Sequence, residues 1–168
     1  RHFMACDPFA TMRDYWHLVD ARKACVLCVD RLENASRIDQ GALDSDRVGP
    51  FTQWQGNLRA PLMVVAQDFS DVAGFRKYQG WAGHDIQTNL TLRHLLACAG
   101  VKISVPKCGV PDDQLFFTNA VLCMKSGTAG GRQQSIPSRC FKNCSSFLRR
   151  SIEIVAPALV VTLGVGAL

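Results

Sequence analysis

The sequence predicts one α/β domain, a three-layer α/β/α sandwich with a central parallel sheet. Two observations predict this fold class. Three short apolar runs have the length and composition of buried strands, and segments with helical periodicity lie between them. Strands that alternate with helices form right-handed crossovers, which give a parallel sheet covered on both faces. The chain has 168 residues and 48% hydrophobic side chains, enough for one core, so we expect a single domain over residues 1–168.

The first half of the chain is expected to be helical, then irregular, then extended. The apolar spacing of residues 7–28 fits one or two helices, and the polar stretch 29–58 indicates a long loop with a short helix. Residues 61–66 (Pro-Leu-Met-Val-Val-Ala) are a continuous apolar run followed at once by Gln67 and Asp68. That pattern is typical of a buried parallel strand that ends at a functional loop.

The second half repeats the alternation of helix and strand. Residues 88–99 carry leucines on a helical stripe, and residues 115–122 are apolar enough for a second strand. A Gly-, Ser- and Gln-rich loop at 126–137 precedes an amphipathic helix at 138–155. Residues 159–164 (Leu-Val-Val-Thr-Leu-Gly) complete the pattern as a third buried strand.

Polar side chains at the strand ends are the first candidates for a site, because open parallel sheets bind ligands at the carboxyl ends of their strands. A side-chain amide such as that of Asn119 offers a ligand one acceptor and two donors. A carboxylate such as that of Asp68 can stabilise developing positive charge and orient a water molecule. Two structural roles stay open: Asn119 can cap a neighbouring loop, and Asp68 can cap a turn or helix.

The eight cysteines indicate a metal site in a reducing compartment. An even number of cysteines can also form the disulfides of a secreted protein. However, these cysteines lie inside apolar periodic segments, a chain of this size does not need such cross-links, and no signal peptide precedes them. No run of about 18 apolar residues predicts a membrane span. The net charge of +5 suits a polyanionic partner such as DNA without requiring one.

Three segments together resemble the uracil-DNA glycosylase superfamily. Residues 64–70 (Val-Val-Ala-Gln-Asp-Phe-Ser) are similar to its water-positioning motif, which reads Gly-Gln-Asp-Pro-Tyr in family 1. Residues 117–123 (Phe-Thr-Asn-Ala-Val-Leu-Cys) resemble the strand that reads uracil, with its Asn-x-Val pattern. Residues 152–167 follow the pattern of a later strand of the superfamily. The resemblance extends from about Cys25 to the end, although the iron–sulfur families carry Gly-Glu-x-Pro-Gly in the first motif and this chain does not.

The resemblance implies a base excision repair enzyme that removes uracil from DNA. Such a hydrolase flips the nucleotide into a pocket and breaks its glycosidic bond with water, leaving an abasic site. Asp68 would serve the water and the sugar cation, and Asn119 would read the base. Gln67 would present its backbone or side chain to the uracil edge, and Phe69 or Tyr78 would stack on the base. We expect a monomer in the bacterial cytoplasm, associated with the nucleoid and with no membrane contact.

The cysteines resemble those of the iron–sulfur branch, which places a pair before the domain and two more after the Asn-bearing strand. The resemblance implies a structural [4Fe–4S] cluster on four thiolates, with zinc as the alternative metal. The implied ligands are Cys25, Cys28, Cys123 and Cys144. Cys140 lies one helical turn before Cys144 and can replace it as a ligand. The remaining cysteines are expected to be buried packing residues, with Cys98 on the apolar side of its helix: Cys6, Cys98 and Cys108.

Residues 78–83 (Tyr-Gln-Gly-Trp-Ala-Gly) resemble the Phe-x-Gly-x-Ala-Gly segment of the iron–sulfur families, which puts Tyr78 at the stacking position. Trp81 is expected to pack in the core. The loop and helix after Cys123 carry basic residues that can contact phosphates or lie on a solvated helix face: Arg132, Arg139, Lys142, Arg149 and Arg150.

One part of the superfamily pattern has no match. A second catalytic motif, His-Pro-Ser or similar, would follow the next strand, and the four histidines of this chain do not lie in such a context. We therefore expect the sequence to be truncated at its C-terminus and its activity to be lost or weakened. A non-catalytic DNA-binding module stapled by an iron–sulfur cluster or zinc is the alternative function, and an electron-transfer protein is a third. Neither of these needs Gln67, Asp68 and Asn119 at strand ends.

Overall fold

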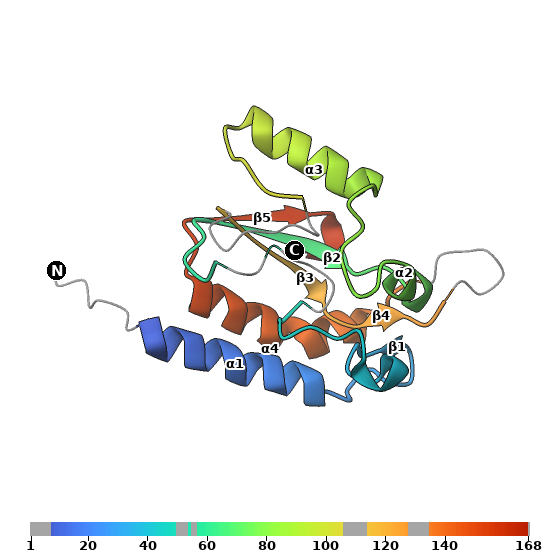
Figure 1. The fold of residues 1–168 in the computed structure, drawn as a ribbon. Coiled ribbons are helices and arrows are strands. Elements are labelled where there is room, and N and C mark those ends of the chain that lie inside the picture. The colour runs from blue at the N-terminus through green and yellow to red at the C-terminus, as the bar shows by residue number, and fades with distance from the viewer. Residues whose placement is uncertain (1–7, 50–53, 55–56, 106–113, 128–134, 168) are drawn as a thin grey trace.

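A computed structural model describes residues 8–49, 54, 57–105, 114–127 and 135–167. Its helices and strands alternate along the chain as predicted (Figure 1). In order they are α1 (Pro8–Ala24), β1 (Leu32–Glu33), the 3-10 helix η1 (Ile38–Gly41), β2 (Leu62–Asp68), α2 (Val72–Lys77), α3 (Gln87–Cys98), β3 (Leu115–Val121), β4 (Met124–Lys125), α4 (Ser138–Val155), β5 (Leu159–Leu163) and the 3-10 helix η3 (Val165–Ala167).

The sheet of the domain is parallel and has the strand order β3-β2-β5. Leu62 of β2 pairs with Leu115 of β3 and with Leu159 of β5 at one end of the strands. Ala66 pairs with Asn119 near the other end, which sets Asp68 and Asn119 at the same edge of the sheet. The short strands β1 and β4 form a separate antiparallel pair. The predicted α/β fold with a central parallel sheet is confirmed.

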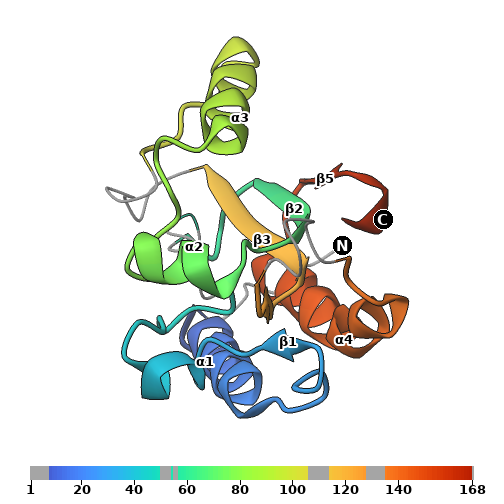
Figure 2. The same cartoon turned by 90° about the vertical axis from the view of Figure 1, so that its right-hand side faces the viewer.

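The two faces of the sheet bury different sets of side chains, because successive residues of a strand point to opposite faces. Met63, Val65 and Phe116 pack with the residues of α1 and α4 in the larger core. Leu62, Val64, Leu115 and Phe117 instead pack with Trp54 and with Leu92 of α3. Figures 1 and 2 show the result as three layers, with α1 and α4 side by side below the sheet and α3 above it.

Several elements differ from the prediction. The first helix ends at Ala24, so Cys25 and Cys28 lie in the turns that follow it rather than within it. Helix α2 is too short for a periodic pattern; it is capped by Asp71, whose Oδ1 accepts a hydrogen bond from the Gly74 N–H at 2.7 Å. Strands β1 and β4 have two residues each, which no pattern predicts.

Three predictions of burial are wrong. Strand β5 is exposed rather than buried, with Leu159 58% exposed, because it lies at the edge of the described sheet. Cys98 is exposed at the end of α3, since that helix packs on the sheet through Leu92 and leaves its C-terminal turn in solvent. Trp81 is 37% exposed and does not join the core. Cys6, Cys108 and Arg132 lie outside the described residues.

A buried ion pair ties α1 to the segment that follows η1. The side chain of Arg22 is 2% exposed, and its guanidinium lies 2.8 Å from both carboxylate oxygens of Asp44. The same group donates to the carbonyls of Ser45 and Arg47. Since these four contacts join the end of α1 to a distant loop, they hold the start of the cysteine-bearing turns in place. No helix in the described part of the chain is long and apolar enough to span a membrane.

Candidate functional site

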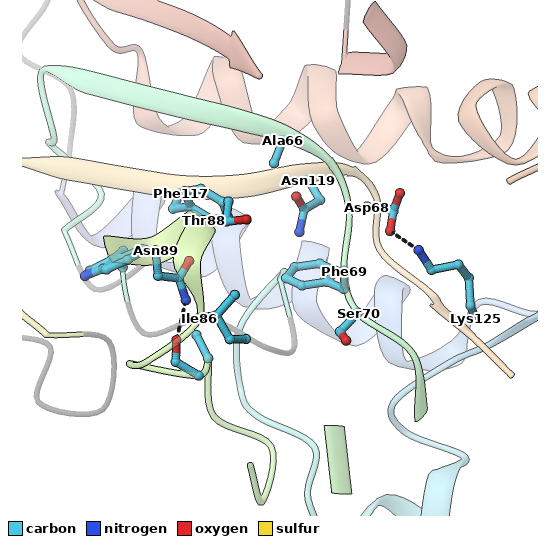
Figure 3. A pocket seen from close by; sticks show the side chains of 13 residues that line it. Ala66, Asp68, Phe69, Ser70, Ile86, Thr88, Asn89, Phe117, Asn119 and Lys125 are labelled. Atoms are coloured by element: carbon cyan, nitrogen blue, oxygen red, sulfur yellow. Dashed lines mark hydrogen bonds and ion pairs between the residues drawn. The ribbon is translucent and has the colours of Figure 1, made fainter. Parts of the chain in front are cut away.

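A pocket of about 290 Å³ opens at the carboxyl ends of β2 and β3 (Figure 3). Residues of both strands, of the loops after β2 and before α3, of the first turn of α3 and of β4 line it, together with Trp54. The lining residues are Trp54, Ala66, Asp68, Phe69, Ser70, Ala82, Gly83, Ile86, Thr88, Asn89, Phe117, Asn119 and Lys125. The pocket is therefore placed where ligands of open parallel sheets bind.

Asp68, the last residue of β2, is held at the pocket by two neighbours. Its Oδ1 lies 2.8 Å from Lys125 Nζ, and the two side chains are only 15% and 5% exposed. Its Oδ2 accepts a hydrogen bond from Gln67 Nε2 at 3.2 Å. Because both carboxylate oxygens are engaged, the plane of the carboxylate is fixed, and its charge faces the pocket beside a buried cation.

Asn119 carries a buried acceptor that has no protein partner among the described residues. The residue is 3% exposed, and its Oδ1 makes no hydrogen bond there. It lies two residues after Phe117, so both side chains point to the same face of β3, and Figure 3 shows the amide directed into the pocket on the side of Phe69. Buried polar atoms are almost always paired, and an unpaired one costs about 1–3 kcal/mol. The orphaned oxygen fits an acceptor kept for a ligand.

One predicted aromatic residue lines the pocket and the other does not. Phe69 is 5% exposed and forms part of the wall next to Asn119. Tyr78 lies at the end of α2, behind the lining residue Gly83: a Cβ on Gly83 would stand 2.8 Å from Cζ of the Tyr78 ring. Gly83 is therefore small enough to let Tyr78 pack against the loop, and the ring supports the pocket wall from outside.

Gln67 points away from the pocket. The Gln67 side chain is exposed at the end of β2 and does not line the pocket, although its Nε2 reaches Asp68 Oδ2. It packs against η3, where a Cβ on Gly166 would stand 2.7 Å from Gln67 Oε1. Of the five predicted site residues, Asp68, Phe69 and Asn119 meet in the pocket, whereas the side chains of Gln67 and Tyr78 do not line it.

Lys125 and Asn89 are among the pocket residues that were not predicted from the sequence. Lys125 is 57 residues from its partner Asp68, and its two-residue strand gives no periodic signal. Asn89 donates from Nδ2 to the Gly83 carbonyl at 2.6 Å and so fixes the loop before α3. A lysine three residues after the apolar run 115–122 was the available signal for Lys125, because a strand that ends in a pocket can bring such a residue with it.

The predicted thiols converge between the turns after α1 and helix α4. The pKa of Cys123 is raised, first by burial and then by the neighbouring thiols of Cys144, Cys25 and Cys28. The pKa of Cys144 is raised to about 11, chiefly by burial and also by Cys28 and Cys25. Burial raises the pKa of Cys140 to about 11 as well, followed by its hydrogen bond with Cys28. Five thiols thus share one region of the fold.

The chemistry of these thiols suits a metal centre, but the described side chains are not arranged as a complete set of metal ligands. Soft thiolates suit zinc and iron–sulfur clusters. Asn143 also donates toward Cys28 Sγ at 3.4 Å, the kind of contact that orients a ligand. Within the described ranges, however, no three His, Cys, Asp or Glu side chains are grouped so that they could hold a metal ion. The identity and presence of the metal stay predictions.

The geometry defines an α/β domain with a polar pocket at the strand ends, in which a carboxylate, an unpaired amide and an aromatic ring meet. The sequence matches the model of the uracil DNA glycosylase superfamily over residues 54–168, and the chain belongs to this superfamily. No curated protein matches it. The matched range includes every lining residue of the pocket. Membership supports a DNA repair glycosylase in general, while the iron–sulfur branch and the family-1-like Gln-Asp motif stay predictions.

Proposed function

We propose that the protein is a monofunctional uracil-DNA glycosylase whose base pocket is the cavity beside Asp68 and Asn119. The unpaired Oδ1 of Asn119 is the observation that carries this proposal, because a buried acceptor without a partner is costly unless a ligand supplies one. Membership in the uracil DNA glycosylase superfamily supports the same reaction class. A non-catalytic DNA-binding module would have no need of the acceptor or of a carboxylate next to it.

The amide of Asn119 distinguishes uracil from cytosine by its hydrogen-bond pattern. Oδ1 accepts from uracil N3–H, and Nδ2 donates to uracil O4. Cytosine presents an acceptor at N3 and a donor at C4, so both contacts would be repulsive. Phe69 gives the flipped base an aromatic surface, and Tyr78 supports the loop from behind Gly83.

Asp68 stabilises the sugar cation and orients the attacking water. As the bond between C1′ and uracil N1 breaks, the sugar becomes an oxocarbenium-like cation, and uracil leaves with the electron pair of that bond. The carboxylate stabilises the cation and orients a water, whose oxygen bonds to C1′ while its proton passes to the solvent or to the departing base. Lys125, at 2.8 Å, is a positioning residue that keeps the carboxylate directed at the pocket.

Contacts to the DNA backbone are proposed for the basic residues of α4. Arg139 is paired with Asp30, and Arg150 with Glu153, so these two already have protein partners. Lys142 and Arg149 on the same helix carry the remaining positive charge of this group. The net charge of +5 favours the approach of DNA in general.

Uracil binding tests the proposal without requiring turnover. We expect free uracil to shift the side-chain amide resonances of Asn119 in a ¹⁵N spectrum, because a bound base pairs with that amide. The amide of Asn57, which accepts a hydrogen bond from the Arg59 N–H at 2.9 Å and does not line the pocket, is the internal control. Cytosine at the same concentration should leave the Asn119 signals in place. Equal shifts with both bases, or none with uracil, would argue against this pocket as a uracil site.

A [4Fe–4S] cluster on Cys25, Cys28, Cys123 and Cys144 is part of the proposal, with zinc as the alternative metal. The proposal is supported by the proximity of these thiols, because neighbouring thiols raise the pKa of both Cys123 and Cys144. When bound, the cluster supplies a structural cross-link. The ligand cysteines then join the turns after α1 to α4, and the hydrogen bond from Asn143 orients Cys28.

We expect protein purified without oxygen to be brown and to contain about four iron atoms per chain. Cys144→Ser should lose most of the iron, because it removes one of the four thiolates. Cys98→Ser, which changes an exposed thiol on α3, and Cys140→Ser should both retain it. Metal analysis by mass spectrometry gives the counts. Retention of iron in Cys144→Ser with loss in Cys140→Ser would move the fourth ligand to Cys140, and one zinc per chain would favour the alternative metal.

A further inference from the structure

A second hollow adjoins the base pocket. It has a volume of about 210 Å³ and is lined by Lys77, Tyr78, Gln79, Trp81, Ala82 and His84. Ala82 lines the base pocket as well, so the two cavities share part of one wall. The hollow contains two aromatic rings and two basic side chains, which is the combination that binds single-stranded nucleic acid.

Trp81 is an exposed aromatic side chain of this second hollow. It is 37% exposed and also lines a further hollow, together with Gln79, Gly80, residues 42–45 and Arg47. A single exposed aromatic residue needs no explanation by itself. Here the indole lies next to a candidate base pocket and between two cavities, so a flat ligand can reach its surface.

The backbone under Trp81 is rigidly held. Gln79 and Gly80 both adopt left-handed conformations, with φ values of 54° and 75°. A Cβ on Gly80 would stand 2.3 Å from the Leu43 carbonyl oxygen, so the turn packs directly on that loop and only glycine fits. The Gly80 and Trp81 N–H groups donate to the carbonyls of Phe75 and Tyr78. A left-handed non-glycine residue is costly and is often retained at a functional site.

Positive charge lies beside the rings. Lys77 Nζ is 3.3 Å from the Tyr78 hydroxyl oxygen and 4.8 Å from the centroid of the Tyr78 ring. His84 lines the same hollow. The pKa of Asp85 is lowered by a hydrogen bond from its own backbone and by one from the Tyr78 hydroxyl. These hydrogen bonds hold the carboxylate within the turn. A ligand with a flat ring and an anionic group matches the hollow.

We propose that this hollow is a second nucleotide subsite, in which the base adjacent to the flipped nucleotide stacks on Trp81 and its phosphate lies near Lys77 and His84. The inference rests on the proposed function only for the choice of DNA as the ligand. A base that stacks on Trp81 has left the stack of a duplex. The subsite therefore favours single-stranded or locally unpaired DNA, and it binds such DNA whether or not uracil is present.

The test uses the full chain and a fluorescently labelled oligothymidylate that contains no uracil. Trp81→Ala is expected to weaken binding about tenfold, the loss of one base stacked on an aromatic ring. Trp16→Ala is the matched control, since Trp16 is 43% exposed on α1 and lines neither cavity. We expect that control to bind as the unaltered protein does. Anisotropy of the label gives the affinity.

Intrinsic fluorescence gives a second readout. Oligothymidylate should quench the emission of the unaltered protein, and Trp81→Phe should abolish that quenching while retaining most of the affinity, because phenylalanine still stacks. Full affinity and quenching without Trp81, or an equal loss in Trp16→Ala, would overturn the subsite. Trp81-dependent binding without uracil release from a uracil-containing strand would leave the subsite standing and contradict the proposed function. Uracil release by the unaltered protein, together with oligothymidylate binding that does not depend on Trp81, would support the proposed function and overturn the subsite.

Discussion

Asp68→Asn is expected to slow uracil release by about a hundredfold to ten-thousandfold, the range for a positioned catalytic carboxylate. The amide retains the size of the carboxylate but removes the negative charge that stabilises the sugar cation. It also leaves Lys125, whose side chain is 5% exposed, without its counter-charge. Single-turnover kinetics on an oligonucleotide with one uracil measure the chemical step, and anisotropy shows whether DNA binding is retained.

Asp71→Asn is the matched control for that variant. Asp71 lies three residues further along the chain and caps α2 through the Gly74 N–H, but it does not line the pocket. Its substitution should cost at most about 1 kcal/mol of stability and leave the release rate unchanged. Uracil release by Asp68→Asn at the rate of the unaltered protein would remove Asp68 from the mechanism.

Asn119→Leu is expected to be less active and more stable than the unaltered protein. Leucine has nearly the same shape but removes the buried Oδ1 that has no partner, so the free energy of unfolding should rise by about 1 kcal/mol. The loss of both base contacts should lower the rate of uracil release by about a hundredfold or more, as for loss of a preorganised hydrogen-bonding group. Urea unfolding and the single-uracil assay measure the two effects.

Asn34→Leu provides the contrast. Asn34 is buried to the same degree, at 2% exposed, but its Nδ2 donates to the carbonyls of Arg22, Lys23 and Cys25. Its replacement should lower the free energy of unfolding by about 2 kcal/mol, because it leaves these carbonyls short of a donor. If Asn119→Leu destabilised the protein as much as Asn34→Leu, the amide of Asn119 would be structural and the base-reading role would fail.

The sheet and part of the pocket follow from local sequence. Continuous apolar runs give parallel strands, and the carboxyl ends of such strands meet at one edge, which is why Asp68 and Asn119 come together. Alternation along a strand also predicts that Gln67 and Asp68 do not both line the pocket, and only Asp68 does. Tyr78 could not be placed in advance, because its position behind Gly83 depends on how the loop packs.

Lys125 and Cys98 show why the rest needed the structure. The ion pair between Lys125 and Asp68 joins two strands 57 residues apart, and a two-residue strand leaves no pattern. Cys98 lies on a stripe that looks apolar, but α3 packs on the sheet through few residues and leaves its last turn exposed. Both outcomes depend on tertiary contacts rather than on periodicity.

Base release from a single-uracil oligonucleotide tests the central claim most directly. The protein is purified without oxygen, and abasic sites are revealed by cleavage with alkali. We predict cleavage at the uracil that is strongly reduced in Asp68→Asn and in Asn119→Leu, and no cleavage at cytosine in the same position. Folded protein that releases no uracil, or variants that release it as well as the unaltered protein does, would contradict the account.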